Sequence, residues 1–257
     1  MRNYTRLALI CSAAAAPVAF IQGCSEQTPT NPKAVVPNAP QLTQAVLPEF
    51  PGANQFVAVI DNPYYPLIRG TTFEYRSVTP EGVETNTVEV THETKMILGV
   101  AVTVVHDQVF LDGELTEDTF DWFAQDAEGN IWYLGEASCE IEDDKCVSTE
   151  GSWEAGVEGA QPGIIMWADP AAHKGNAYRQ EYFAGEAEDV GKVLSLKASV
   201  ETPYGSFTGC LETADWSLLD SGGAREHKFY CPGTGLLLEV ASPNGKKRSE
   251  LVAIDTP

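Results

Sequence analysis

Basic residues are scarce in this chain of 257 residues. It holds 16 lysines and arginines against 37 aspartates and glutamates, which gives a formal net charge of −21. Proteins that bind nucleic acid neutralise phosphates with cations, so this balance excludes nucleic acid as a partner. Hydrophobic residues make up 43% of the chain. That share is enough for a buried core, and it excludes a chain that is disordered throughout.

The motifs of common catalytic sites are also missing. The chain contains no G-x-S-x-G, no H-E-x-x-H, no S-x-x-K and no phosphate-binding glycine loop. Its four histidines are isolated from one another in sequence. We therefore expect a binding protein rather than an enzyme, without a cofactor. A dispersed Ser-His-Asp triad stays open as an alternative, because geometry and not spacing defines a triad.

The N-terminus has the layout of an export signal. Arg2 and Arg6 precede an uncharged, alanine-rich run from Leu7 to Phe20, which is too short to span a bilayer comfortably. The next four residues, Ile21-Gln22-Gly23-Cys24, resemble a bacterial lipobox. The resemblance implies cleavage before Cys24 and acylation of that cysteine, which anchors the chain in membrane lipid. A plain signal peptide with a chance cysteine is the alternative.

The residue after the lipobox cysteine is Ser25. This resembles Gram-negative lipoproteins that are sent to the outer membrane, and it leaves open whether the protein faces the periplasm or the cell surface. Removing residues 1–23 would take away two arginines and no acid, so the net charge of the mature chain becomes −23.

The remaining cysteines indicate an oxidising compartment. After Cys24 the chain holds Cys139, Cys146, Cys210 and Cys231. An even number of cysteines in an exported chain predicts two disulfides. We favour Cys139 with Cys146 and Cys210 with Cys231, because each pair would lie on neighbouring strands. A metal site is the alternative, although no C-x-x-C occurs.

Three segments follow from these signals. Residues 1–23 are the predicted signal peptide, and residues 24–54 are a lipidated, proline-rich linker that ends at the globular part. Proline at this density disfavours regular structure and favours an extended chain. The linker prolines are Pro29, Pro32, Pro37, Pro40, Pro48 and Pro51.

The remainder, residues 55–257, reads as one antiparallel β domain. Short runs that alternate in polarity or are rich in β-branched residues are separated by turn signals such as Asp112-Gly113. The fold class is therefore all-β, with about ten or more short strands, and an open barrel, a half barrel or a sandwich would satisfy the pattern. Strands are expected at residues 71–78, 83–94, 100–111, 114–125, 131–134, 177–183, 192–198, 210–218, 225–230, 236–240 and 251–254. Irregular loops are expected at residues 151–162 and 170–176.

Several segments resemble a group of exported bacterial β-sheet proteins. The opening Asn62-Pro63-Tyr64-Tyr65-Pro66-Leu67 carries the resemblance most clearly, and Asp121-Trp122-Phe123-Ala124-Gln125-Asp126 and Tyr230-Cys231-Pro232-Gly233-Thr234-Gly235-Leu236 extend it. The closing segment is also distantly similar to periplasmic lipoprotein carriers, which hold acyl chains in a curved sheet. These resemblances imply the fold and export, and they imply no catalytic residue.

Acidic residues are concentrated in one stretch of the chain. Residues 112–158 hold fifteen acids and a single base, Lys145. Carboxylates at this density repel one another unless they are solvated or bridged by a cation. A solvated acidic face is one interpretation, and a calcium site that includes Asp118 and Asp121 is the other.

Aromatic and acidic residues near the expected loops give the candidate binding site. Trp153 and Trp167 lie in or beside the glycine-rich loop, where an aromatic side chain is less needed by the core. Glutamates next to aromatic rings would also suit a glycoside hydrolase, with Glu181 and Glu186 as its paired carboxylates. The predicted ligand-binding residues are Trp153, Glu154, Trp167, Tyr182, Tyr64 and Tyr65.

The sequence thus predicts an envelope lipoprotein that binds a ligand without turning it over. The ligand classes it favours are an amphiphile, a glycan or a cation-bridged envelope component. Two alternatives remain: a secreted glycoside hydrolase, and a structural or partner-binding lipoprotein without a small ligand.

Overall fold

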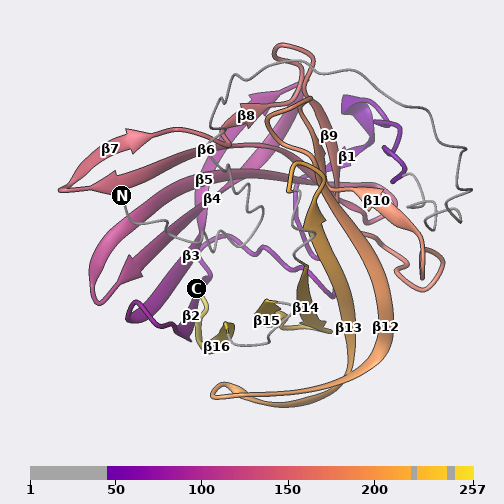
Figure 1. The fold of residues 1–257 in the computed structure, drawn as a ribbon. Coiled ribbons are helices and arrows are strands. Elements are labelled where there is room, and N and C mark those ends of the chain that lie inside the picture. The colour runs from indigo at the N-terminus through magenta and orange to yellow at the C-terminus, as the bar shows by residue number, and fades with distance from the viewer. Residues whose placement is uncertain (1–44, 221–224, 242–246) are drawn as a thin grey trace, which may run out of the picture.

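Antiparallel strands make up almost all regular structure in the computed structural model, which describes residues 45–220, 225–241 and 247–257. They form one 16-stranded sheet that curves into a nearly closed barrel (Figure 1). The predicted all-β class is therefore confirmed, and among the architectures left open the barrel is the one observed. In the described ranges no helix is long and apolar enough to cross a membrane.

The strands follow the chain from β1 to β16 after one short 3-10 helix, η1. The first eight strands are β1 (Phe56–Val57), β2 (Thr72–Val78), β3 (Val83–Ile97), β4 (Val100–Leu111), β5 (Glu114–Asp126), β6 (Ile131–Glu142), β7 (Lys145–Ser148) and β8 (Trp153–Glu154), with η1 at Ala53–Gln55. The others are β9 (Gln161–Met166), β10 (Ala177–Arg179), β11 (Glu181–Tyr182), β12 (Asp189–Thr202), β13 (Gly205–Ser217), β14 (Glu226–Cys231), β15 (Gly235–Ala241) and β16 (Arg248–Asp255).

Alternation of side chains determines which residues line the inside of the barrel. In β2 the side chains of Phe73, Tyr75 and Ser77 are buried, while those of Glu74 and Arg76 are exposed. Successive side chains of a strand point to opposite faces, so this pattern assigns Phe73 and Tyr75 to the interior. Strands β3 to β6 and β13 to β15 supply the facing walls of the same interior.

A short stretch of chain joins the two ends of the sheet. Residues 177–179 pair with β12, and Glu181–Tyr182 pair with β9, so the chain changes partner at Gln180. The backbone of β9 passes so close that a Cβ on Gly163 would collide with the backbone of Gln180. Val46 adds an isolated parallel bridge on Tyr178. The barrel is thus closed by a segment whose first half, β10, pairs with β12 and whose second half, β11, pairs with β9.

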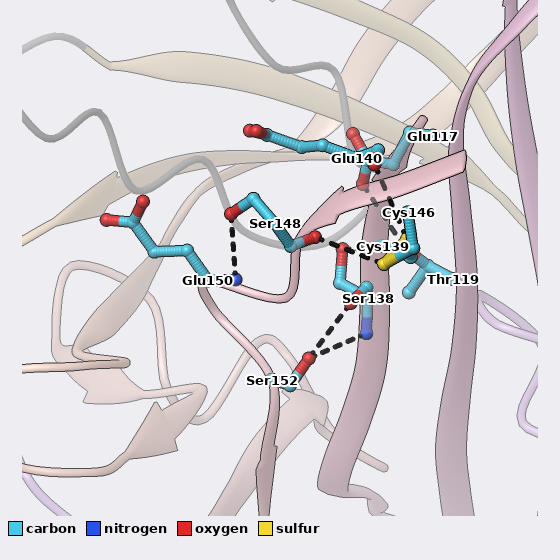
Figure 2. Close-up of a disulfide and its surroundings, with 9 residues drawn as sticks. All are labelled: Glu117, Thr119, Ser138, Cys139, Glu140, Cys146, Ser148, Glu150 and Ser152. Atoms are coloured by element: carbon cyan, nitrogen blue, oxygen red, sulfur yellow. Dashed lines mark hydrogen bonds between the residues drawn. A yellow bond between two sulfur atoms is a disulfide. The ribbon is translucent and has the colours of Figure 1, made fainter. Parts of the chain in front are cut away.

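The structure confirms both predicted disulfides. Cys139–Cys146 links β6 to β7, and Cys210–Cys231 links β13 to β14. Figure 2 shows the first of them beside Ser138 and Ser152. The hydroxyl of Ser152 accepts a hydrogen bond from the backbone N–H of Ser138 at 2.9 Å. The two bridges differ in burial: Cys210 and Cys231 are in the core, whereas Cys146 is exposed.

Two sequence expectations about strands were wrong. The loop expected at residues 151–162 contains β8 and the start of β9, because both pair with β6 despite their Gly and Pro content. The strand expected at 177–183 is interrupted at Gln180 by the change of partner. The signal peptide, Cys24 and most of the linker lie outside the described residues.

The difference in burial predicts the order in which the disulfides are reduced. Under mild dithiothreitol without denaturant, Cys139–Cys146 should open first, because a thiolate reaches its exposed sulfur directly. Cys210–Cys231 should stay closed until the barrel unfolds. Differential alkylation followed by peptide mass spectrometry measures both, and earlier opening of Cys210–Cys231 would contradict this prediction. Removing either bridge by Cys→Ala substitution should lower the free energy of unfolding by about 3 kcal/mol.

Candidate functional site

Four acidic side chains point into the barrel from one wall. They are Asp107 of β4, Glu117 and Asp121 of β5, and Glu136 of β6, each at most 8% exposed. Asp121 and Glu136 are direct cross-strand partners. Like charges opposite each other in a sheet destabilise it, and burial of a carboxylate adds a desolvation cost. This wall therefore works against the stability of the fold.

Hydrogen bonds offset only part of that cost. The Asn86 side-chain amide donates to Asp107 at 2.6 Å, and the Tyr133 hydroxyl donates to Asp121 at 2.7 Å. Burial raises the pKa of Asp121 to about 7, although the Tyr133 hydrogen bond lowers it. Burial, followed by the charge of Asp121, also holds the pKa values of Asp107 and Glu136 well above their ordinary range.

The opposite wall holds the one buried lysine or arginine of the described ranges. The ammonium of Lys228 in β14 lies 3.4 Å from a carboxylate oxygen of Glu239 in β15 and 3.6 Å from one of Asp215 in β13. Burial lowers the pKa of Lys228, but these two carboxylates outweigh burial and raise it well above the usual value. Burial raises the pKa of Glu239 to about 8, against the lowering effect of Lys228. The lysine is thus protonated and lies between the carboxyl groups of Asp215 and Glu239 on its own side of the barrel.

A small cavity lies at the acidic wall. Its volume is about 20 Å³, which is room for roughly one water molecule. Four aromatic rings and two carboxylates line it, together with aliphatic side chains. The aromatic and acidic lining residues are Tyr65, Phe73, Tyr75, Phe123, Asp107 and Asp121. We call this space the interior cavity.

One side of the interior cavity is formed by a segment that crosses the barrel between β1 and β2. Residues 60–67, here called the strap, begin and end at a bridge between Ile60 and Leu67, and Figure 1 shows this purple stretch of chain running across the inside of the sheet. The ring of Tyr65 packs against Phe123 and Tyr230, with centroids 5.7 and 6.0 Å apart. The strap therefore covers the interior cavity with an aromatic side chain.

Asn62 fastens the strap to the barrel. Its side-chain amide donates to the carbonyls of Gly129 at 2.9 Å and Trp167 at 3.2 Å. Its backbone N–H donates to the side-chain oxygen of Gln125 at 2.9 Å. At the far side the backbone N–H of Gly233 donates to the carbonyl of Pro63 at 2.7 Å. These bonds hold Tyr65 over the cavity in one place.

The predicted ligand-binding residues do not gather at one place. Tyr65 lines the interior cavity, and Tyr64 precedes it on the strap. Trp153 is in the core, edge-on to Tyr133 at 5.4 Å. Trp167 stacks on His173 at 3.6 Å. The last two engage neighbouring cations: Glu154 pairs with Lys95 at 2.7 Å, and the ring of Tyr182 lies under Arg179 at 5.1 Å.

The predicted acidic pairs are also separated. Glu181 is 1% exposed, whereas Glu186 lies exposed in the turn between Phe183 and Ala187. Asp118 lies on the outer face of β5, where its Oδ1 atom accepts from the side-chain amide of Gln108 and is 2.7 Å from Nε2 of His106. Asp121 points inward. Among the described residues no group of three or more histidine, cysteine or acidic side chains is arranged to hold a metal ion.

Sequence reasoning missed most of the interior polar residues. Asp107 stands among buried valines of β4, and Lys228 lies two residues before the buried Tyr230 of β14, on the same face. A charged residue at an inward position of an otherwise apolar strand is the signal that was available. The missed charged residues of the two walls are Asp107, Glu117, Glu136, Asp215, Lys228 and Glu239.

The raised pKa values predict that the fold is more stable at mildly acidic pH. From about pH 5 the folded protein keeps a proton on Asp121 up to about pH 7 and on Glu239 up to about pH 8, whereas their unfolded pKa values are near 4. The free energy of unfolding therefore falls as pH rises, by about 1.4 kcal/mol per pH unit for each extra proton held. Urea denaturation followed by circular dichroism at each pH measures this slope.

An Asp121→Asn variant should show a shallower slope, because it removes one of the proton-binding groups. Glu201→Gln, which removes an exposed carboxyl group, is the control for the change in net charge. A free energy of unfolding that increases steadily from pH 5 to pH 8 would contradict the prediction.

Comparison with known proteins adds only distant likenesses. No protein-family model matches the chain, and no curated protein matches it in sequence. The fold is similar to a "putative exported protein with YmcC-like fold" from Bacteroides fragilis, with a TM-score of 0.44 and 14% identity, over 75% of this chain and 99% of that one. It is also similar to a "putative lipoprotein" from Parabacteroides distasonis, with a TM-score of 0.41 and 10% identity, over 75% of this chain and 98% of that one.

Proposed function

We propose that this chain is an exported, lipid-anchored protein that binds a small molecule in its interior cavity without turning it over. The observation that carries the proposal is the lining of that cavity. Two buried carboxyl groups, Asp107 and Asp121, stand beside four aromatic rings, and burial of such groups costs stability. Buried groups that cost stability and converge on a cavity are the usual mark of a binding site.

The mixed lining favours an amphiphile among the ligand classes considered. Phe73, Val88 and Leu236 offer an apolar wall, and Asp107 and Asp121 offer acceptors at one side of it. A small molecule with a short apolar body and one polar end matches both. A glycan would need many more polar partners than this lining supplies.

The strap gives such a molecule a route to the cavity. In the structure the cavity holds about one water molecule, so a larger ligand requires the side chains of Tyr65 and Leu67 to move aside. Side-chain and isolated backbone hydrogen bonds hold the strap, together with the burial of Tyr65 and Leu67, and the strand ladder of the barrel does not include it. Movement of the strap therefore opens the cavity while the sheet stays intact.

The anchor follows from the leader of the chain itself. Ile21-Gln22-Gly23-Cys24 supports lipidation at Cys24, and Ser25 supports delivery to the outer membrane. The proline-rich linker then holds the barrel at a distance from the bilayer. The two distantly similar structures bear the names of an exported protein and a lipoprotein, and the proposal for this chain rests on its own sequence.

Binding in the cavity is testable with four-carbon probes. We expect 1-butanol or n-butylammonium to shift the backbone amide resonances of residues that line the cavity, in two-dimensional nuclear magnetic resonance spectra of the full chain. Val88→Phe should abolish these shifts, because the added ring fills the space at a cost of about 1–3 kcal/mol. Val78→Phe on the exposed face of β2 is the matched control. Shifts from neither probe at the cavity would overturn the proposal.

Lipid anchoring is tested at the cysteine. In a Gram-negative host grown with labelled palmitate, the full chain should take up label and fractionate with outer membranes. Cys24→Ala should lose the label and leave the membrane fraction, because it removes the thiol to which the proposed lipid is attached. Cys146→Ala, which removes an exposed disulfide cysteine, should keep both properties. An unlabelled wild-type chain in the soluble fraction would contradict anchoring.

A further inference from the structure

We propose that the ligand of the interior cavity is an organic cation, bound through a protonated amino group that lies between the aromatic rings and the carboxylates of Asp107 and Asp121. This inference rests on the proposed function and names the chemical class of its ligand. Two features of the interior support it independently: the rings and the charge balance.

The rings around the cavity suit a cation. Tyr65, Phe73, Tyr75 and Phe123 all line it. The hydroxyl of Tyr75 already donates to the backbone carbonyl of Leu236 at 3.1 Å, so this residue offers a ligand mainly its ring. The face of an aromatic ring carries partial negative charge, and it attracts an ammonium group most strongly where water is excluded. Four rings around one small space are the arrangement used for ammonium recognition.

The two carboxyl groups of the cavity have no cationic partner. Asp107 and Asp121 line the cavity, and neither forms an ion pair with a lysine or arginine of the described ranges; the buried Lys228 lies between Asp215 and Glu239. In the free protein the raised pKa values of Asp107 and Asp121 favour the protonated form. A bound ammonium would take the place of those protons as the positive charge beside the carboxylates.

An organic cation fits this site better than a metal ion. Calcium requires six to eight oxygen ligands, and the described residues contain no group of three or more candidate ligands in a suitable arrangement. An ammonium group needs up to three acceptors and gains from ring faces that a hydrated metal ion does not use. The aliphatic lining at Val88, Val105 and Leu236 then accommodates the carbon chain.

The test compares three probes of equal length that differ in their polar end: n-butylammonium, 1-butanol and butyrate. Dissociation constants come from the amide shifts of cavity residues in the full chain at neutral pH. We expect n-butylammonium to bind about ten-fold more tightly than 1-butanol, and butyrate to bind too weakly to measure.

Two variants assign that preference to the carboxylates. Asp107→Asn and Asp121→Asn should each bring n-butylammonium to within about three-fold of 1-butanol, while binding of the alcohol is retained. Asp118→Asn removes the same charge from the outer face of β5 and should leave the preference intact. Phe73→Leu removes one ring and should weaken the ammonium more than the alcohol, which gives a second readout if an acidic-wall variant does not fold.

The outcomes separate the two proposals. Binding of 1-butanol at the cavity with an equal or weaker affinity for n-butylammonium would overturn the cation inference and leave the binding site in place. The cation inference would also be overturned if both Asp107→Asn and Asp121→Asn still bound n-butylammonium more tightly than 1-butanol by the same factor as the unaltered chain. Absence of all three probes from the cavity would overturn the binding site itself.

Discussion

Burial of acidic side chains is the constraint on which the interior of this protein depends. Asp107, Glu117, Asp121 and Glu136 share one wall, and the one buried lysine or arginine of the described ranges, Lys228, pairs with acids of the opposite wall. Desolvation and mutual repulsion both oppose this arrangement. It persists because the ladders of a nearly closed barrel and two disulfides hold the strands in place. The scaffold therefore has the rigidity to keep polar groups where they are costly.

The rest of the interior is consistent with a site kept ready for a ligand. Aromatic rings fill the space that a wide barrel would otherwise leave to water, and the strap places Tyr65 over what remains. The strap is tied by Asn62 and Pro63 and not by a strand ladder. A permanent wall and a separately fastened cover are what a binding protein needs if the ligand has to enter a desolvated space.

Local signals explain how much of this could be predicted. Both bounds of β4 were expected at residues 100–111, because a β-branched run ends at an Asp-Gly turn. The disulfide pairs followed from the same hairpin logic. β9 was missed since Pro162 and Gly163 indicate a loop, and only its pairing with β6 makes it a strand. Asp118 and Asp121 are an odd number of residues apart, so strand periodicity alone separates their faces. The inward position of Lys228 left a signal in the sequence, but its pairing with Asp215 and Glu239 was beyond prediction, because these residues come from three strands whose register no local pattern reveals.

The central claim is that the acidic wall serves binding at the expense of the fold. The most direct measurement is the free energy of unfolding of the Asp107→Asn/Asp121→Asn double variant at pH 8, by urea denaturation beside the unaltered chain. Asparagine still accepts the hydrogen bonds of Asn86 and Tyr133 and removes the buried charge. The account predicts a double variant that is more stable than the natural sequence. A double variant that is less stable by about 1 kcal/mol or more would show that the carboxylates support the fold, which would contradict it.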